Sequence, residues 1–309
     1  MTEGKPWAGP MVDAHQHFWD PAANQHPWLA PGARIPFRYG DYEAIKRPYL
    51  PPDYAADVRG HNVQETVYVE TEWDPSDPIG ETRYASWLAE IHGRPNAIVA
   101  QAWLDRADAA EVLAQQAAFP LVRSVRHKPG GPARADEVGP ACRTLMSDEN
   151  WRRGYERLHH HGLHFDLQTP WWNLPEAGRL AADFPATTLI LNHAGLPSDR
   201  DPEALRAWRS AMEGFAQHDN VGVKISGLGL PGRAWTVAEN CWVVREIIAM
   251  FGSARSMFAS NFPVDSLCAS FDTIFSGFKQ ITRDDPPDVQ ELLFAGTARR
   301  IYRTDGRSR

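Results

Sequence analysis

Three histidines stand where they could bind a metal ion or take part in proton transfer. His15 and His17 close the first apolar run of the chain, in the segment VDAHQH. If this run is a β-strand, residues two apart point to the same side, so both imidazoles face one site. His193 closes a later apolar run, LILNH. Imidazoles are common zinc ligands and acid–base groups, and the alternative is that all three are buried for structural reasons.

Polar residues also stand at or near the ends of other apolar runs. Each one singly is explained by a salt bridge or by a hydrogen bond to a loop. Together they predict a polar pocket, because a fold built only for stability does not need ionisable groups at so many of these ends. They are Glu70, Arg126, His127, Lys128, Asp166, Gln168, Lys224, Ser226 and Asn261.

Short β-type runs alternate with amphipathic stretches along the chain. The expected strands cover 11–15, 65–70, 97–103, 121–127, 163–168, 187–193, 221–226 and 256–260. The expected helices cover 79–92, 107–118, 140–161, 174–183, 202–217, 237–251, 266–281 and 287–303. Alternation of this kind indicates parallel βαβ units, and eight units predict a (β/α)8 TIM barrel. The carboxyl ends of the strands then form the active-site face, where the histidines and the other polar residues stand.

The competing fold is an open, doubly wound sheet that binds a nucleotide. Such a sheet needs a glycine-rich phosphate loop, and the sequence contains neither Gly-x-Gly-x-x-Gly after the first strand nor Gly-x-x-x-x-Gly-Lys. The barrel is therefore favoured, and no nucleotide cofactor is expected.

Residues 18–64 form the longest stretch without a predicted strand, and they are rich in proline and aromatic residues. This stretch is too long for a simple connection, so we expect it to fold over the barrel mouth as a lid. A loop without ligand contact is the alternative. We find no internal repeat and no linker-like segment, so residues 1–309 are expected to form a single domain.

Composition restricts the class of protein. Of the 309 residues, 43% are hydrophobic and 23% are charged, which is typical of a globular chain. The net charge of −7 argues against a nucleic-acid partner. No apolar run is long enough for a membrane span, the N-terminal stretch lacks a signal-peptide core, and three distant cysteines suggest no disulfide framework. We therefore expect a cytoplasmic protein with a small-molecule substrate and no membrane partner, and leave homo-oligomer formation open.

Six motifs together resemble the sugar-lactonase group of the amidohydrolase-related (amidohydrolase 2 type) family, which includes enzymes like L-fuconolactonase, L-rhamnonolactonase and 2-pyrone-4,6-dicarboxylate lactonase. The resemblance runs from about residue 11 to residue 302 and rests on VDAHQHFWDP, SVRHKPG, FDLQ, LILNHAGLP, VGVKISGLG and MFASNFPVD. It implies a distorted (β/α)8 barrel and ring opening of a lactone by water. His15 and His17 match the first-strand pair of this group, His193 its sixth-strand histidine, and Arg126 with His127 its fourth-strand segment.

The chain departs from the family pattern at two strand ends. Asp166-Leu167-Gln168 stands where the wider superfamily often has a histidine ligand. The eighth-strand motif, usually Gly-Ser-Asp-Trp-Pro, reads Ala259-Ser260-Asn261-Phe262-Pro263. An amide has no useful proton affinity near neutral pH, so Asn261 cannot replace the aspartate as a general base. It can orient a water molecule, donate to an oxyanion, or ligate a metal weakly.

Two mechanisms remain open. In the first, His15, His17 and His193 bind a divalent ion, zinc being the best suited, which lowers the pKa of a bound water molecule. In the second, no metal is bound, the histidines donate to the lactone carbonyl, and a carboxylate takes the proton from water. The candidate bases are Glu70, Glu72 and Asp265, and we favour Glu70 because it closes a strand.

For the substrate, Arg126 and Lys128 beside His127 suggest an anionic group. Gln168 joins this polar set, and indole rings could form walls for a small ring: Trp19, Trp28, Trp73, Trp171 and Trp172. Two other functions stay open. One is a metal-dependent decarboxylase of the same superfamily, and the other is a small-molecule binder without catalytic activity.

Overall fold

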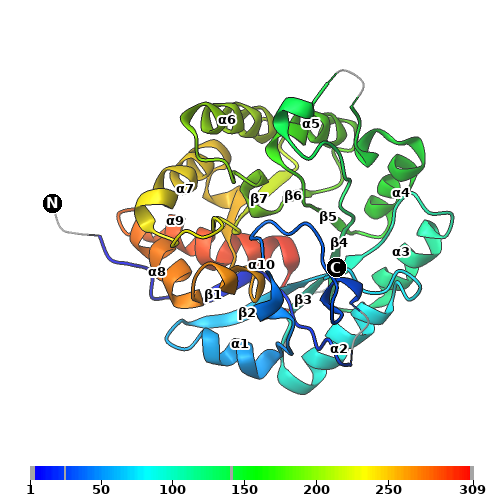
Figure 1. Cartoon of the computed structure of the whole chain (residues 1–309), viewed down its shortest axis with the longest axis horizontal. Helices are drawn as coiled ribbons and strands as arrows, with labels where there is room; N and C mark the ends of the chain where they lie inside the picture. The colour runs from blue at the N-terminus through cyan, green and yellow to red at the C-terminus, as the bar shows by residue number, and fades with distance from the viewer. Residues whose placement is uncertain (1–3, 24–25, 140–141, 307–309) are drawn as a thin grey trace.

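The computed structural model describes residues 4–23, 26–139 and 142–306, and shows a ring of strands surrounded by helices (Figure 1). In this part of the chain, eight strands form one sheet in sequence order, each parallel to the next. They are β1 (Met11–Gln16), β2 (Val63–Val69), β3 (Ala97–Gln101), β4 (Val122–Arg126), β5 (His164–Leu167), β6 (Leu189–Leu191), β7 (Val221–Ile225) and β8 (Ser256–Phe258).

The first strand meets the segment after the last one at the carboxyl end of the ring. Gln16 pairs in parallel with Phe262, and the N–H of His17 donates to the Phe262 carbonyl at 2.8 Å. The N–H of Asn261 donates to the His15 carbonyl, also at 2.8 Å. These contacts complete a (β/α)8 TIM barrel, so the predicted fold class is confirmed. They also bring Asn261 beside the histidines of β1.

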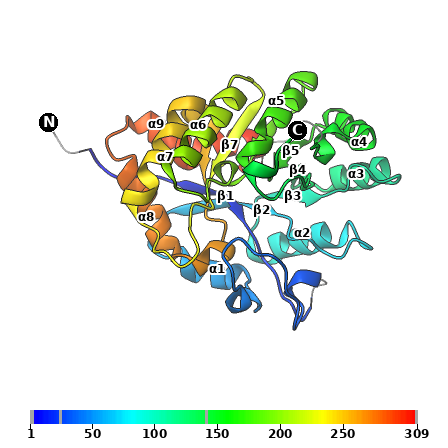
Figure 2. The ribbon, with the colours of Figure 1, turned by 45° about the horizontal axis from the view of Figure 1, so that its top comes forward.

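Helices pack around the outside of the barrel (Figure 2). They are α1 (Pro51–Asp57), α2 (Gly80–His92), α3 (Ala109–Ala118), α4 (Glu149–His160), α5 (Leu174–Asp183), α6 (Pro202–Ala216), α7 (Val237–Phe251), α8 (Phe271–Ile281), α9 (Pro287–Glu291) and α10 (Thr297–Tyr302). Over the described ranges, none of these helices combines the length and the apolar character that a bilayer crossing requires.

The sixth strand is shorter than predicted. We expected 187–193, and β6 ends at Leu191. The N–H of Asn192 still donates to the Leu167 carbonyl at 2.8 Å, but the chain then turns with a φ of 54° at His193. His193 therefore stands on a turn just beyond the strand, not in its last position, and this turn brings its side chain to the barrel mouth.

The predicted helix over 140–161 begins later than expected. Residues 140–141 lie outside the described part of the chain, and α4 begins after Asp148. The Asp148 carboxylate accepts the Trp151 N–H at 2.9 Å, which satisfies a helix-end donor and fixes the start of the helix.

The last two predicted helices differ from expectation in different ways. The stretch 266–281 was expected to be one helix, but α8 begins only after Ser270, whose hydroxyl accepts the N–H of Thr273 at 3.1 Å. The stretch 287–303 is helical from Pro287 to Tyr302 as predicted, with α9 and α10 joined without a gap by a π-helix at Leu292–Gly296. Local capping chemistry, which the periodicity of apolar residues does not report, explains the first difference.

The loop between β1 and α1 covers the barrel mouth, as predicted for the stretch 18–64, and crosses the middle of the view in dark blue (Figure 1). The rest of that stretch does not: Pro51–Asp57 form α1 outside the barrel, and β2 begins at Val63. Trp19 and Tyr49 pair through two backbone hydrogen bonds of 3.0 and 2.8 Å. The buried Trp19 indole also donates to the carbonyls of Ile45 and Arg47 at 3.1 Å. These bonds tie the two ends of the loop together, so its aromatic residues form a fixed wall above the strands.

Candidate active site

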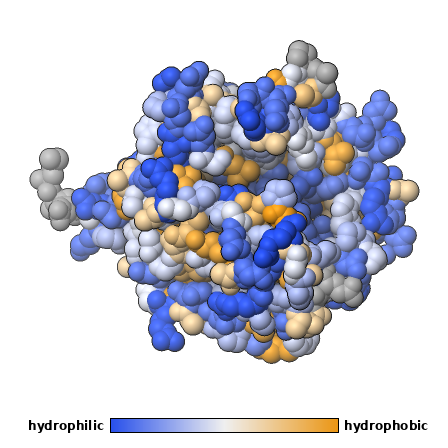
Figure 3. All heavy atoms as spheres, in the orientation of Figure 1, coloured by the Kyte–Doolittle hydropathy of each residue, from blue (hydrophilic) through white to orange (hydrophobic). Residues whose placement is uncertain are grey.

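A pocket of about 250 Å³ lies at the carboxyl ends of the strands, under the loop that follows β1. Its polar lining is His17, Arg38, Glu70, Thr71, Glu72, Arg126, Lys128, Gln168, His193 and Asn261. Its apolar lining includes Trp19, Trp28, Ile35, Phe37 and Leu196. The space suits a small ring and is below the usual size of a site for a larger ligand. On the face seen in Figure 3, hydrophobic residues lie among hydrophilic ones near the middle.

The three histidines lie close together, as predicted. The ring centres of His15 and His17 are 4.9 Å apart, and those of His15 and His193 are 4.6 Å apart. His17 and His193 line the pocket, whereas His15 lies buried behind them and has no hydrogen-bond partner for either ring nitrogen within the described residues. Burial, and next the charge of Lys224, hold the pKa of His15 well below its usual value.

His17 has a defined tautomer. Its Nδ1 lies 2.7 Å from the Val69 carbonyl oxygen, which can only accept, so Nδ1 carries the proton. Its Nε2 lies 3.3 Å from Oδ1 of Asn261. Burial, and next the charge of Arg126, lower the pKa of His17 to about 3. The ring is therefore neutral near pH 7, and Nε2 presents a lone pair to the pocket.

His193 is held by strand β7. Its Nδ1 lies 2.9 Å from the Ser226 hydroxyl, which can donate to it and leave the proton on Nε2. Burial, and next the charge of Arg38, keep the pKa of His193 well below its usual value. His193 is thus a second neutral imidazole, with its other nitrogen free for a ligand.

The three histidines lie together without enclosing a shared ion position. Across the described ranges, no three His, Cys, Asp or Glu side chains are placed to hold one ion. The eighth-strand position offers the amide of Asn261 and no carboxylate. Both ring nitrogens of His15 are buried without a partner in the described residues, and neutral imidazoles are the donors of catalytic zinc sites, so His15, His17 and His193 are the residues that would hold an ion here.

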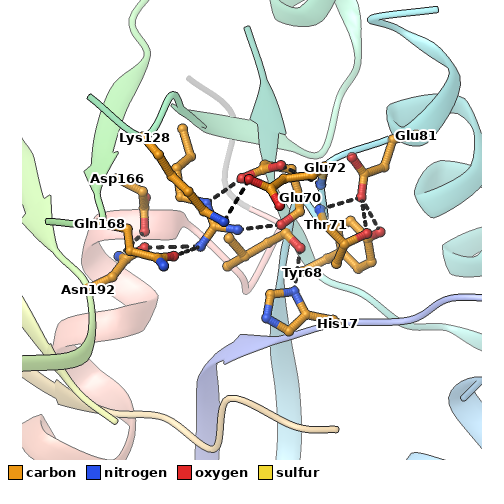
Figure 4. Close-up of polar contacts among 12 residues, drawn as sticks. His17, Tyr68, Glu70, Thr71, Glu72, Glu81, Lys128, Asp166, Gln168 and Asn192 are labelled. Atoms are coloured by element: carbon orange, nitrogen blue, oxygen red, sulfur yellow. Dashed lines mark hydrogen bonds and ion pairs between the residues drawn. The ribbon is translucent and has the colours of Figure 1, made fainter. Parts of the chain in front are cut away.

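Glu70 and Arg126 form a buried ion pair at the ends of β2 and β4 (Figure 4). The Arg126 Nε donates to Glu70 Oε1, and its Nη2 donates to the Glu70 carbonyl at 2.5 Å. Arg126 Nη1 donates to Gln168 Oε1 at 2.9 Å. Glu70 Oε2 accepts the N–H of Glu72 at 2.8 Å. Both oxygens of Glu70 are therefore engaged within the protein.

Glu72 and Lys128 form a second pair, which is open to solvent. Lys128 Nζ lies 2.8 Å from Glu72 Oε1, and their side chains are 37% and 43% exposed. Glu72 has a φ of 59°, an uncommon value for a residue with a side chain. In the described chain no hydrogen bond engages its Oε2, so this pocket-lining carboxylate keeps a free oxygen.

Asn261 and Asp265 form a buried chain behind His17. Asn261 Nδ2 donates to Asp265 Oδ1 at 2.6 Å, and the Tyr39 hydroxyl donates to the same oxygen at 2.9 Å. Burial raises the pKa of Asp265. Asp265 does not line the pocket, so it supports Asn261 from behind and does not reach a pocket water molecule directly.

Several residues predicted for the site lie elsewhere. His127 faces away from the pocket, and its Nδ1 accepts the Trp151 indole N–H at 3.0 Å. The ring of Trp73 packs against His26 at 5.1 Å, and the Trp172 indole donates to the Pro132 carbonyl at 3.0 Å. These predictions placed residues by sequence distance from a strand end, and loop geometry turned the side chains away. Trp19, Lys128 and Gln168 do line the pocket as expected.

Asp166 and Lys224 lie inside the barrel, below the pocket. Lys224 Nζ is 2.6 Å from Asp166 Oδ1, and both side chains are fully buried. The Tyr302 hydroxyl of α10 donates to both Asp166 oxygens, at 2.9 and 3.0 Å. This pair is a structural element of the barrel floor, although both residues seemed to be pocket candidates from their place in the strands.

Sequence reasoning missed Arg38. It lies in the loop segment RIPFRYGDY and lines the pocket opposite the strand ends. The only available signal was a basic residue within an aromatic stretch already predicted to cover the barrel mouth. Nothing in the spacing distinguished it from Arg34, which lies outside the pocket lining and pairs with Glu43 at 2.5 Å.

Comparison with known proteins agrees with this site on this barrel. The family model described as amidohydrolase matches residues 12–304, so the chain belongs to the amidohydrolase family and is an enzyme of the hydrolase class. An uncharacterized protein from Sinorhizobium fredii is 38% identical over 298 residues, covering 95% of this chain and 98% of its own. An L-fucono-1,5-lactonase from Burkholderia multivorans is 28% identical over 304 residues, covering 94% and 95%.

A solved structure gives the same fold. The crystal structure of an amidohydrolase from Burkholderia multivorans with bound zinc has a TM-score of 0.77 and 26% identity, and the match covers 96% of this chain and 99% of the other. The resemblance to lactonases of this family is therefore confirmed, and zinc is known in one of these relatives.

Proposed function

We propose that this enzyme opens the ring of a small polar lactone by adding water to its carbonyl group. The observation that carries the proposal is one pocket that Glu72, whose Oε2 is free of hydrogen bonds in the described chain, lines together with two neutral imidazoles, His17 and His193. The L-fucono-1,5-lactonase relatives support this reaction class. We propose a sugar-acid or dicarboxylate-type lactone as the substrate. We also propose that residues 1–309 form one catalytic domain.

The reaction needs a base for water and a stabilised oxyanion. We propose Glu72 as the base, in place of Glu70, because both Glu70 oxygens are already engaged by hydrogen bonds within the protein. Lys128 pairs with Oε1 of Glu72, which leaves Oε2 to take a proton from water. The lone pair on His17 Nε2 accepts the second water hydrogen and orients the attack.

The water oxygen then bonds to the carbonyl carbon, and negative charge forms on the carbonyl oxygen. His193 donates from Nε2 to that oxygen, with Ser226 fixing the tautomer through Nδ1. When the ring C–O bond breaks, protonated Glu72 returns its proton to the leaving alkoxide. The product is a hydroxy acid, which releases one proton at neutral pH.

This mechanism uses the chain's own residues, in which Glu72, His17 and His193 supply the base and the donor without a metal ion. Elemental analysis and chelation test that choice. We expect less than stoichiometric zinc and unchanged hydrolysis after chelation. One equivalent of zinc, with activity lost on chelation and restored by zinc, would replace this mechanism by one with His15, His17 and His193 as ligands.

A pH-indicator assay on a panel of lactones tests the reaction itself. Hydrolysis acidifies the solution without gas, decarboxylation of an aromatic acid releases carbon dioxide, and a non-catalytic binder does neither. We expect acidification by the wild type and about a 100-fold slower rate with Glu72→Gln. Carbon dioxide release without acidification on lactones would favour the decarboxylase.

A further inference from the structure

The charged residues around the pocket do not balance. Five of them line it: Arg38, Glu70, Glu72, Arg126 and Lys128. Glu70 pairs with Arg126, and Glu72 pairs with Lys128. Arg38 has no carboxylate oxygen of a described residue within 4.0 Å. The lining therefore keeps one positive charge in excess. An aspartate at position 261 would have offset it, and Asn261 does not.

Arg38 is held so that one side of its guanidinium faces the pocket. Nη2 donates to the Gly227 carbonyl, and the guanidinium carbon lies 4.5 Å from the ring centre of Tyr39. Nη1 is buried and has no hydrogen-bond partner in the described part of the chain. A buried guanidinium N–H without an acceptor is costly, so this atom calls for an acceptor from a ligand.

The position of Gly227 shows that Nη1 of Arg38 lies near His193. A Cβ added to Gly227 would lie 2.9 Å from Arg38 Nη1 and 2.9 Å from His193 Nδ1. The free donor and Nδ1 of His193 therefore flank the same glycine, on the side of the imidazole ring away from the Nε2 that we place at the lactone carbonyl. Gly227 also has a φ of +62°, and both facts make glycine necessary for this close approach.

Asp265 is a buried carboxyl near Arg38, but the two side chains form no ion pair within 4.0 Å. Its Oδ1 accepts hydrogen bonds from Tyr39 and Asn261. Burial, the largest effect, raises the pKa of Asp265, and the charge of Arg38, the next in size, lowers it. The two groups interact through space, and no direct contact from Asp265 occupies the Arg38 guanidinium.

We propose that Arg38 binds a carboxylate of the substrate, which makes it the residue that selects acidic over neutral lactones. This inference rests on the proposed lactone hydrolysis and narrows its substrate to a lactone that bears one carboxylate besides the ring. Arg126 and Lys128, which the sequence suggested for this role, are already paired. The carboxylate contacts Nη1, and the ring lies between the loop and the strand ends.

Calorimetric binding tests the inference without requiring turnover. The probes are D-glucaro-1,4-lactone and D-glucono-1,4-lactone, which differ by a carboxylate in place of a hydroxymethyl group. The variants are Arg38→Met, Arg38→Lys and, as a matched control from the same loop, Arg34→Met. We expect the wild type and Arg34→Met to bind the acidic probe at least about 10-fold more tightly than the neutral one. Arg38→Met should lose this preference, and Arg38→Lys should keep part of it.

Equal binding of both probes by the wild type, or no binding of the acidic probe, overturns the inference. So does an unchanged preference in Arg38→Met, whose thermal midpoint should stay near that of the wild type. Selective acidic binding that depends on Arg38 but is never followed by acidification supports the Arg38 site and contradicts the proposed hydrolysis. The two proposals therefore fail separately.

Discussion

Glu70 and Glu72 stand two residues apart after the same strand, but their surroundings differ. Glu70 is buried, and its partner Arg126 is buried with it, whereas Glu72 and Lys128 are 43% and 37% exposed. The inner pair, Glu70 with Arg126, is thus buried away from water, and either charge left without its partner would be strongly destabilising. The outer pair, Glu72 with Lys128, stays hydrated and leaves one carboxylate oxygen of Glu72 free. The comparison teaches that the inner pair is closed to a ligand, whereas the outer pair leaves a carboxylate oxygen for the reaction that we propose.

The largest expected effect comes from breaking the inner pair. Arg126→Met leaves the Glu70 carboxylate buried without its counter-ion, and we expect a loss of about 3 to 5 kcal/mol in the free energy of unfolding. Urea denaturation of the wild type and the variant measures this. The double variant Glu70→Gln/Arg126→Met should recover part of the loss. A loss below about 1 kcal/mol in the single variant would show that the inner pair contributes no more to the free energy of unfolding than an exposed pair does.

The next effect separates the two carboxylates by chemistry. Glu72→Gln removes the proposed base, and we expect kcat/KM for the lactone to fall about 100-fold, or about 2.7 kcal/mol, with stability changed by less than about 1 kcal/mol. Steady-state kinetics and urea denaturation of the same preparations check both values. Full activity in Glu72→Gln would return the role of base to Glu70 or Asp265.

The histidines beside the inner pair make stability depend on pH. Because folding lowers the pKa of His17 from about 6.5 to about 3, the unfolded chain binds more protons between these values. The free energy of unfolding should therefore decrease as pH falls through this window, by up to about 1.4 kcal/mol per pH unit for each such histidine. The raised pKa of Asp265 acts in the opposite direction above pH 3.8.

Urea denaturation at pH 7, 6 and 5 measures this dependence. His17→Asn should reduce the slope, and the exposed His160→Asn should leave it unchanged. Stability that is flat over this range in the wild type would contradict the neutral, buried state of the imidazole cluster.

The smallest effect is expected for the outer pair. Lys128→Met removes the partner of Glu72, and because both side chains are well exposed we expect the free energy of unfolding to change by less than about 1 kcal/mol. The difference from the wild type should shrink further in about 1 M salt, which screens exposed charges. A change as large as that of Arg126→Met would mean that the outer pair is buried when the protein is folded in solution.

Much of the architecture could be predicted from the chain itself. Alternating β-type and amphipathic runs depend on local periodicity, so the order of the barrel elements and the position of His15 and His17 at the end of β1 followed directly. The sequence also showed that Asn261 stands where the eighth-strand motif usually has Asp. That Asn261 cannot act as a general base followed directly, because an amide lacks a useful proton affinity whatever its surroundings. The loop over the mouth was predictable from its length and composition.

The tertiary structure alone decided which side chains meet. His127 turned toward Trp151, and Asp166 with Lys224 became a buried pair in the barrel floor. Arg38 became a site residue because the loop fold brought it next to Gly227 and His193. A sequence determines residue types and local periodicity. Ion pairing and burial depend instead on which distant segments come into contact. Pairing and burial then decide whether a charged side chain stabilises the fold or remains free for a ligand.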